Sequence, residues 1–228
     1  MRPSSVLAVA VSAALGIGLG IVGGSVLDRG PDTFADPLAL GIPYRNVSCD
    51  GRVLLTVGRG SASQVGSALA AYQDLNVSYL ATNRSCPTIW TPDPGRKPPY
   101  VAYVGPFGNS AAACDTLFRA GHGGGIVTVL KAGTPEIVPC LCHVKVARPL
   151  LRNGSSNEGT GGVWIRQLQR MLIDMGVATK DSASGSYDAS MAAEIRDFQR
   201  HNHLGATGEV DDATWSKLLL LGCRLYTT

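Results

Sequence analysis

The chain has 228 residues, of which 45% are hydrophobic and 16% charged, and its formal net charge at pH 7 is +3. This composition excludes a disordered polymer, and the length leaves room for one mid-sized domain or, in better agreement with the shifts in composition, two small ones. No dense basic run interleaved with aromatic residues is present, so we expect no nucleic-acid partner.

The first 27 residues are expected to direct export. Met1–Ser5 carries one Arg, and Val6–Leu27 is then an uncharged run of 22 residues. Such a run is about long enough for a helix to cross a bilayer core of roughly 30 Å. We expect residues 1–27 to stay in the cytoplasmic membrane as a signal anchor. The alternative is a cleaved signal peptide, with Thr33–Ala35 as the cleavage site and the remainder secreted to the cell wall.

The region 46–146, called the middle region, alternates strand and helix patterns after a Pro-rich linker at 28–45. The strand-like runs are Val53–Val57, Val77–Leu80, Tyr100–Val104 and Ile126–Leu130, and the helical patterns are Ser61–Asn76 and Ser110–Ala120. The order is therefore β-α-β-β-α-β. Two crossovers of this kind usually build a four-stranded antiparallel sheet with both helices on one face.

The region 163–223, called the helical region, follows a second linker at 147–162 that is rich in Gly, Ser and Asn. Its apolar residues recur at helical spacing in three groups: Ile165, Leu168, Leu172 and Met175; Met191, Ile195 and Phe198; and Trp215, Leu218 and Leu219. Asp188 and Asp211 are suited to cap the second and third helices. The fold class expected for the whole chain is α+β: a transmembrane or signal helix, a β-α-β-β-α-β sandwich and a small three-helix bundle.

Charge is shared unevenly between these regions. From Arg45 to Arg152 the sequence has eleven Lys and Arg against five Asp and Glu, whereas from Val163 to the end it has seven against eight. The basic excess of the middle region suits anionic wall polymers or lipid headgroups, and it suits ordinary solubility equally well.

The helical region carries a motif that runs through most of its length. It reads Val163-x-x-x-x-Leu168-Gln169-x-x-Leu172, Gly176, Gly185-x-Tyr187-Asp188, Ala193, Phe198-Gln199, Leu204, Gly208-x-Val210-Asp211 and Thr214-Trp215-x-x-Leu218. In this it resembles the peptidoglycan-binding domain 1 family. The resemblance implies a partner in peptidoglycan, either its glycan or its stem peptide. Gln169, Tyr187 and Gln199 are the candidate ligand contacts. The alternative, favoured for Gln199, is hydrogen bonding that ties the helices and turns together.

The middle region is similar, over fewer landmarks, to SPOR-like domains. The supporting features are its element order and the turn Tyr103-Val104-Gly105-Pro106-Phe107 leading into the second helix. Related Cys-bearing domains occur on exported actinobacterial proteins. The resemblance implies binding to glycan strands, and Tyr79 and Tyr103 are the candidates for stacking on sugar rings. Packing of the same two rings within the fold is the alternative.

Patterns that carry catalysis are missing from the sequence. His201-x-His203 lacks a matching third ligand, and Cys142-His143 are neighbours, which is the wrong geometry for a nucleophile and its base. No zinc-protease, Walker or Gly-x-Ser-x-Gly pattern is present. We therefore expect a non-catalytic cell-wall binding protein without metal or cofactor. The alternatives are a peptidoglycan hydrolase or its accessory subunit, with zinc held by His201, His203 and a carboxylate, and a scaffold that binds a wall-synthesis protein.

The cysteines support export, because all of them follow the apolar segment and their number is even. They are Cys49, Cys86, Cys114, Cys140, Cys142 and Cys223. In an oxidising compartment this indicates three disulfides, for which fifteen connectivities exist. Their placement along the two regions suggests the pairs Cys49–Cys86, Cys114–Cys140 and Cys142–Cys223, the last of which closes the ends of the helical region.

Overall fold

A computed structural model describes residues 36–89, 97–121, 124–155, 159–179 and 184–226. The expected anchor at 1–27 and the first part of the linker at 28–45 lie outside these residues. Within them, no helix is both long and apolar enough to span a bilayer. Thr33–Thr228 forms one compact unit of the chain.

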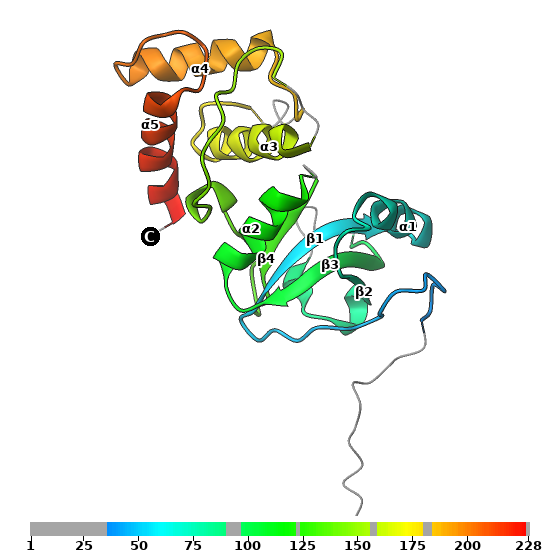
Figure 1. Ribbon diagram of the computed structural model, residues 1–228. Coiled ribbons are helices and arrows are strands. Elements are labelled where there is room, and N and C mark those ends of the chain that lie inside the picture. The colour runs from blue at the N-terminus through cyan, green and yellow to red at the C-terminus, as the bar shows by residue number, and fades with distance from the viewer. Residues whose placement is uncertain (1–35, 90–96, 122–123, 156–158, 180–183, 227–228) are drawn as a thin grey trace, which may run out of the picture. The chain divides into compact units, whose positions relative to one another are not determined.

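The middle region contains a five-stranded antiparallel sheet with helices, as the α+β prediction requires (Figure 1). Its strands are β1 (Val53–Gly60), β2 (Val77–Ala81), β3 (Tyr100–Phe107), β4 (Ile126–Val129) and β5 (Glu136–Ile137), in the spatial order β2-β3-β1-β4-β5. The predicted four-stranded sheet is therefore wrong by one strand. β5 pairs with Thr128 and Val129 through only two residues, which is too short for any alternating pattern to reveal it.

The central strand β1 shows why the sheet has two buried faces. Side chains alternate along a strand, so Val53, Leu55 and Val57 lie on one face while Leu54 lies on the other. The first set packs in a cluster with the helices α1 (Ala62–Ala71) and α2 (Ser110–Ala120). Leu54 belongs to a second cluster, whose other members are Val47, Leu80, Cys86, Ile89, Val101, Tyr103 and Leu130. Residues outside the regular elements thus cover the sheet face that the helices leave open.

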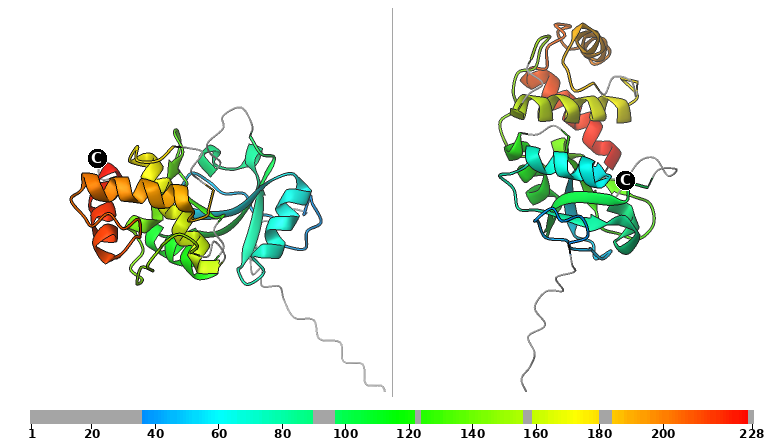
Figure 2. Two further views of the ribbon diagram at one scale, coloured as in Figure 1. Left: turned by 90° about the horizontal axis from the view of Figure 1, so that it is seen from above. Right: turned by 90° about the vertical axis from the view of Figure 1, so that its right-hand side faces the viewer.

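The helical region contains α3 (Gly159–Asp174), α4 (Ala189–His201) and α5 (Asp212–Gly222), shown in two further views in Figure 2. The expected caps are confirmed: Asp188 accepts a hydrogen bond from the N–H of Met191 at 2.9 Å, and Asp211 accepts one from the N–H of Thr214 at 2.8 Å. The side chain and the N–H of Thr214 also lower the pKa of Asp211. α3 begins at Gly159, so the last residues assigned to the linker at 147–162 are helical.

An unbroken apolar cluster joins the sheet helices to α3, α4 and α5. The ring of Phe118 on α2 lies 4.4 Å from that of Trp164 on α3, and Trp164 lies 5.7 Å from Trp215 on α5. The segment between the two regions is held as well, because Leu151 forms an antiparallel bridge with Val210.

Three disulfides staple the fold. Cys49 is joined to Cys86, Cys114 to Cys140 and Cys142 to Cys223. These are the pairs that the placement of the cysteines suggested, and no cysteine is left free. All three disulfides and both apolar clusters lie within Thr33–Thr228.

Candidate functional site

A polar groove lies in the helical region between α3 and the first turns of α4. Its volume is about 260 Å³. The residues that line this groove are Gln169, Thr179, Ser184, Asp188, Ser190, Met191 and Glu194. Hydroxyls, an amide, two carboxylates and the thioether of one methionine thus line it. Among the described lining residues there is no aromatic ring and no cation.

Local sequence explains why these groups face the groove. Ser190 and Glu194 are four residues apart on α4, so they lie on the same side of the helix one turn apart. Asp188 precedes the helix as its cap and Met191 follows one turn on. The N-terminal half of α4 therefore forms one wall, and Gln169 of α3 forms part of the other.

The side chain of Gln169 holds the groove together from within. Its Oε1 accepts the N–H of Gly185 at 2.8 Å, and its Nε2 donates to the hydroxyl of Ser184 and the carbonyl of Ser186, both at 3.1 Å. Only 2% of the residue is exposed. Because each of its polar atoms is already bonded within the protein, Gln169 positions the wall of the groove.

Gln199 repeats this arrangement one helix later. Its Oε1 accepts the N–H of Gly208 and its Nε2 donates to the carbonyl of Glu209, both at 2.8 Å. Nε2 also lies 3.0 Å from the hydroxyl of Thr214. In both arrangements the glycine that the glutamine binds stands three residues before the aspartate that caps the next helix. The two glutamines therefore set where α4 and α5 begin.

Gly208, the glycine bound by Gln199, cannot be replaced without strain. Its φ is +75°, in the left-handed region, and a Cβ there would lie 2.8 Å from the carbonyl oxygen of Ala192. Tyr187, the third candidate contact, donates its hydroxyl to the carbonyl of Gly208 at 2.9 Å. Burial raises the pKa of Tyr187 far above its usual range, so the hydroxyl stays protonated and acts as a donor. The exposed fraction of Tyr187 is 2%, and that of Gln199 is 0%.

Replacement of Gln199 by leucine separates a structural role from a ligand role. The variant leaves the buried N–H of Gly208 and the carbonyl of Glu209 without their partner, which we expect to cost about 3 kcal/mol of unfolding free energy. Urea denaturation measures this loss. The matched control is Gln73→Leu at an exposed position, expected to change stability by less than about 0.5 kcal/mol. Equal stability of the two variants would contradict the structural role.

The two tyrosines expected to stack on sugar are inside the fold. Tyr79 has an exposed fraction of 0% and Tyr103 one of 1%. Tyr79 packs its ring 5.0 Å from that of Tyr44 and donates its hydroxyl to Asp36, while Tyr103 donates to the carbonyl of Arg45 at 2.9 Å. Burial, followed by the bond to Asp36, raises the pKa of Tyr79 to about 12. In this conformation neither ring offers a face to a sugar, which favours the packing alternative.

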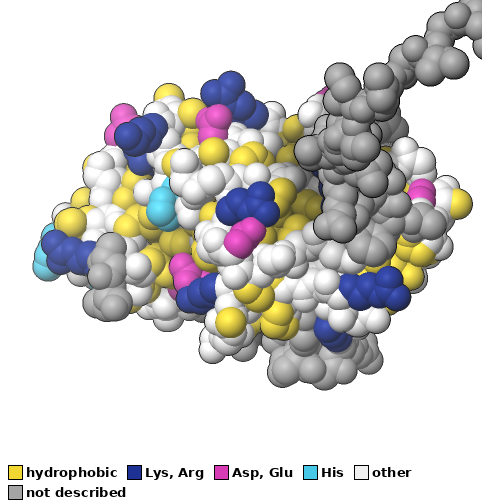
Figure 3. All heavy atoms as spheres, turned by 90° about the horizontal axis from the view of Figure 1, so that it is seen from below, with side chains coloured by type: hydrophobic (Ala, Val, Ile, Leu, Met, Phe, Trp, Pro, Cys, Tyr) yellow, Lys and Arg dark blue, Asp and Glu magenta, His cyan; other side chains and the backbone are white. Residues whose placement is uncertain are grey.

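Cations are dispersed over one face of the molecule. On the face seen from below, Lys and Arg side chains stand apart from one another, with hydrophobic and acidic side chains between them (Figure 3). Arg52 is paired with Asp50 at 2.7 Å, and Arg119 with Asp115 at 2.7 Å. Two of the cations of the middle region are therefore held in local ion pairs, and the excess of cations over acids remains.

The histidines considered as zinc ligands have ordinary surroundings. A ring nitrogen of His201 lies 2.8 Å from the carbonyl oxygen of Asp197, one turn back on α4, and His203 follows the helix. In the parts of the chain that the structure describes, no three His, Cys, Asp or Glu side chains converge to hold a metal.

Comparison with known families assigns the region that contains the groove. Residues 162–218 match the family model PG_binding_1, the peptidoglycan binding domain. The match covers residues 162–218 alone, and this part of the chain is thus similar to peptidoglycan binding domains. Comparison with curated proteins and with solved structures found no match. The SPOR-like resemblance of the middle region has no support from these comparisons and stays a prediction.

Of the three candidate ligand contacts predicted from sequence, Gln169 alone is among the described residues that line the groove. Thr179, Ser184 and Glu194 were missed, because each is an ordinary surface residue until α3 and α4 are packed. The spacing of Ser190 and Glu194 beside the cap Asp188 was the one local signal for this wall.

Proposed function

We propose that the protein is an exported, non-catalytic peptidoglycan-binding protein, anchored in the cytoplasmic membrane by its N-terminal segment. The observation that carries the proposal is the peptidoglycan-binding domain at residues 162–218, with the groove between α3 and α4 inside it. The uncharged run Val6–Leu27 and the pairing of all six cysteines in disulfides support export, because disulfides persist in oxidising compartments.

The chemistry of the groove favours the stem peptide of peptidoglycan over its glycan. Sugar-binding sites commonly offer an aromatic face, and none is found among the described lining residues of the groove. The carboxylates of Asp188 and Glu194 instead suit an amine, and the hydroxyl of Ser190 suits a peptide amide. We place the amine of the stem peptide beside Glu194.

Sedimentation with purified sacculi tests the proposed function. Thr33–Thr228 lacks the hydrophobic N-terminal run, so any binding belongs to the compact unit. We expect it to sediment with intact sacculi at low and moderate salt, and to bind glycan strands stripped of stem peptide at least tenfold more weakly. No release of soluble fragments from the sacculi is expected. Failure to sediment under both salt conditions overturns the proposal, and equal binding to stripped strands overturns the assignment to the stem peptide.

Replacement of Glu194 by glutamine tests the groove itself. Loss of a charged hydrogen-bond acceptor should weaken sacculus binding about tenfold. The matched control is Asp212→Asn, which removes an exposed carboxylate from the first turn of α5, outside the groove. The control should bind like the unaltered protein. If both variants bind alike, the groove is not where peptidoglycan binds.

A further inference from the structure

Exposed hydrophobic side chains are concentrated on two short segments of the chain. Among the described residues, the large hydrophobic side chains that are exposed are Val146 (41%), Leu150 (53%), Leu220 (49%), Leu225 (50%) and Tyr226 (40%). Single exposed hydrophobic residues are normal on a soluble protein, and they are usually scattered. Here they fall within residues 143–150 and 220–226, which are far apart in sequence.

Two links, one covalent and one a hydrogen bond, bring these segments together. The disulfide Cys142–Cys223 joins them at one end, with the Cα atoms 5.7 Å apart. Further along, the ring N–H of Trp215 donates to the carbonyl of Pro149 at 2.9 Å. Residues 143–148 therefore run along α5 between two fixed points. The exposed residues of both segments, together with Lys145, Arg148 and Arg224, are called the Cys142–Cys223 patch.

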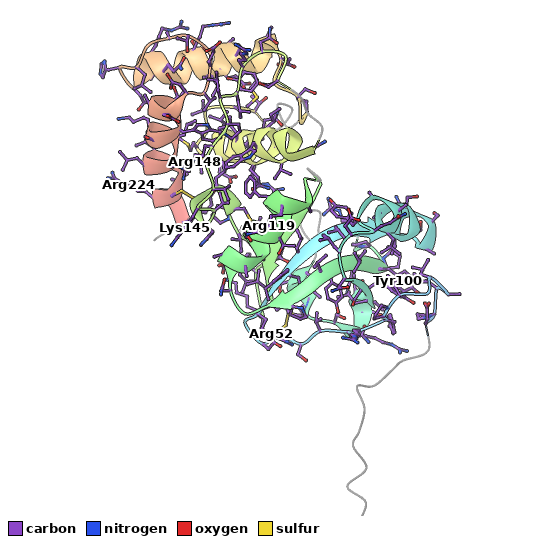
Figure 4. All side chains as sticks on the ribbon, in the orientation of Figure 1. Arg52, Tyr100, Arg119, Lys145, Arg148 and Arg224 are labelled. Carbon is purple, nitrogen blue, oxygen red and sulfur yellow. A yellow bond between two sulfur atoms is a disulfide. The ribbon has the colours of Figure 1, made fainter. Side chains whose placement is uncertain are left out.

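The charge of the patch has one sign. Residues 143–152 and 217–226 contain five Lys and Arg and no Asp or Glu. Figure 4 shows Lys145, Arg148 and Arg224 around the C-terminal half of α5. One acid from a neighbouring element touches the patch: Asp174 at the end of α3 accepts a hydrogen bond from Tyr226 and interacts with the cation of Arg170. The acid is thus offset by a cation of its own helix.

The patch lies apart from the cavities described so far and from two in the middle region. None of its side chains lines the groove between α3 and α4 or either of the two cavities of the middle region. A peptide or sugar would need a concave site, whereas a lipid surface needs only projecting apolar side chains with cations beside them. Leu and Val side chains enter the headgroup boundary, and Lys and Arg side chains extend to the phosphates.

We propose that the Cys142–Cys223 patch docks on the surface of a membrane that contains anionic phospholipid. The exposed apolar side chains of two linked segments, together with five cations and no acid within those segments, carry this assignment. The proposal is independent of peptidoglycan binding, because the patch and the groove share no residue.

Vesicle sedimentation of Thr33–Thr228 with its disulfides intact tests the proposal without interference from the hydrophobic N-terminal run. The vesicles contain phosphatidylcholine alone or phosphatidylcholine and phosphatidylglycerol in equal parts. We expect binding to the anionic vesicles that is at least tenfold stronger than binding to the neutral ones and that weakens in high salt. Absence of binding to anionic vesicles, or equal binding to both kinds, overturns the proposal.

Two variants separate the apolar and cationic contributions. Leu220→Ser/Leu225→Ser removes apolar tips, and Lys145→Gln/Arg148→Gln removes two charges; each should weaken binding to anionic vesicles about tenfold. The matched control is Arg84→Gln/Lys97→Gln, which removes one Arg and one Lys that are exposed on the middle region. An equal loss in the control means that only overall charge matters, and it overturns the patch.

Sacculus sedimentation of the same variants keeps the two proposals apart. Because the groove is untouched, both patch variants should bind sacculi like the unaltered protein, and this also shows that they are folded. A second copy of the chain is the competing occupant. Sedimentation velocity that finds a dimer lost in Leu220→Ser/Leu225→Ser, without vesicle binding by the unaltered protein, assigns the patch to self-association and overturns the lipid proposal.

Discussion

Replacement of Trp215 by alanine is expected to lower the free energy of unfolding by about 4 kcal/mol, within the usual range for a buried Trp. Trp215 is 2% exposed, and its ring packs edge-on against Trp164, which in turn contacts Phe118 of the middle region. Its N–H also holds the carbonyl of Pro149. The substitution leaves a cavity where α5, α3 and the connecting segment meet. Urea denaturation followed by circular dichroism measures the loss.

Trp215→Phe divides this cost into its parts. Phenylalanine keeps most of the apolar packing but cannot donate to the carbonyl of Pro149, so it should cost about 1–2 kcal/mol. The connecting segment 143–150 should then exchange its amide hydrogens faster, while α4 keeps its protection. If Trp215→Ala costs less than about 1.5 kcal/mol, the ring does not carry the junction between the two regions.

Removal of the Cys142–Cys223 disulfide should destabilise the protein by a similar amount. The two cysteines are 81 residues apart in sequence, and closing a loop of that length restricts the unfolded chain by about 4 kcal/mol. The variant Cys142→Ser/Cys223→Ser removes both thiols, so no reactive cysteine remains from the pair. The expected result is a loss of about 4 kcal/mol in urea denaturation at neutral pH.

A second disulfide variant, which should loosen a different part of the fold, is the control for this prediction. Cys49→Ser/Cys86→Ser removes the disulfide that staples the face of the sheet opposite the helices. Hydrogen exchange should show faster opening of α5 in Cys142→Ser/Cys223→Ser, and of the ends of β1 and β2 in the control. Unchanged protection of α5, or a loss of less than about 1 kcal/mol, would show that the disulfide does not hold this end of the helical region.

Elements with local signals could be predicted from sequence. The caps Asp188 and Asp211 act on N–H groups only three residues away, so the pattern that identifies them lies within one turn. The strands around Leu54 and Val101 stand out because they are apolar and bounded by turn residues. β5 could not be found, since a two-residue strand exists only through its pairing with β4.

The burial of Tyr79 and Tyr103 could not be predicted from sequence. Alternation along a strand tells which residues share a face, but it does not tell whether that face is open to solvent. Tyr103 lies on the face covered by Val47 and Ile89, which come from segments without periodic pattern. Tyr79 lies on the helix face and is covered by Tyr44. Stacking on sugar was a reasonable expectation for exposed rings, and tertiary packing removed the exposure.

The likeness of the helical region to peptidoglycan binding domains could be read from sequence, because the motif from Val163 to Leu218 consists of core positions, caps and turns that recur at local spacing. The uses of the polar residues in that motif were decided only in the tertiary structure. Gln169 and Gln199 are turned inward by bonds to Gly185 and Gly208, more than one helical turn away in sequence. The groove, and the patch beside Cys223, likewise bring together side chains from separate elements. Local patterns report which backbone forms, whereas a binding surface depends on which distant segments the folded chain places side by side.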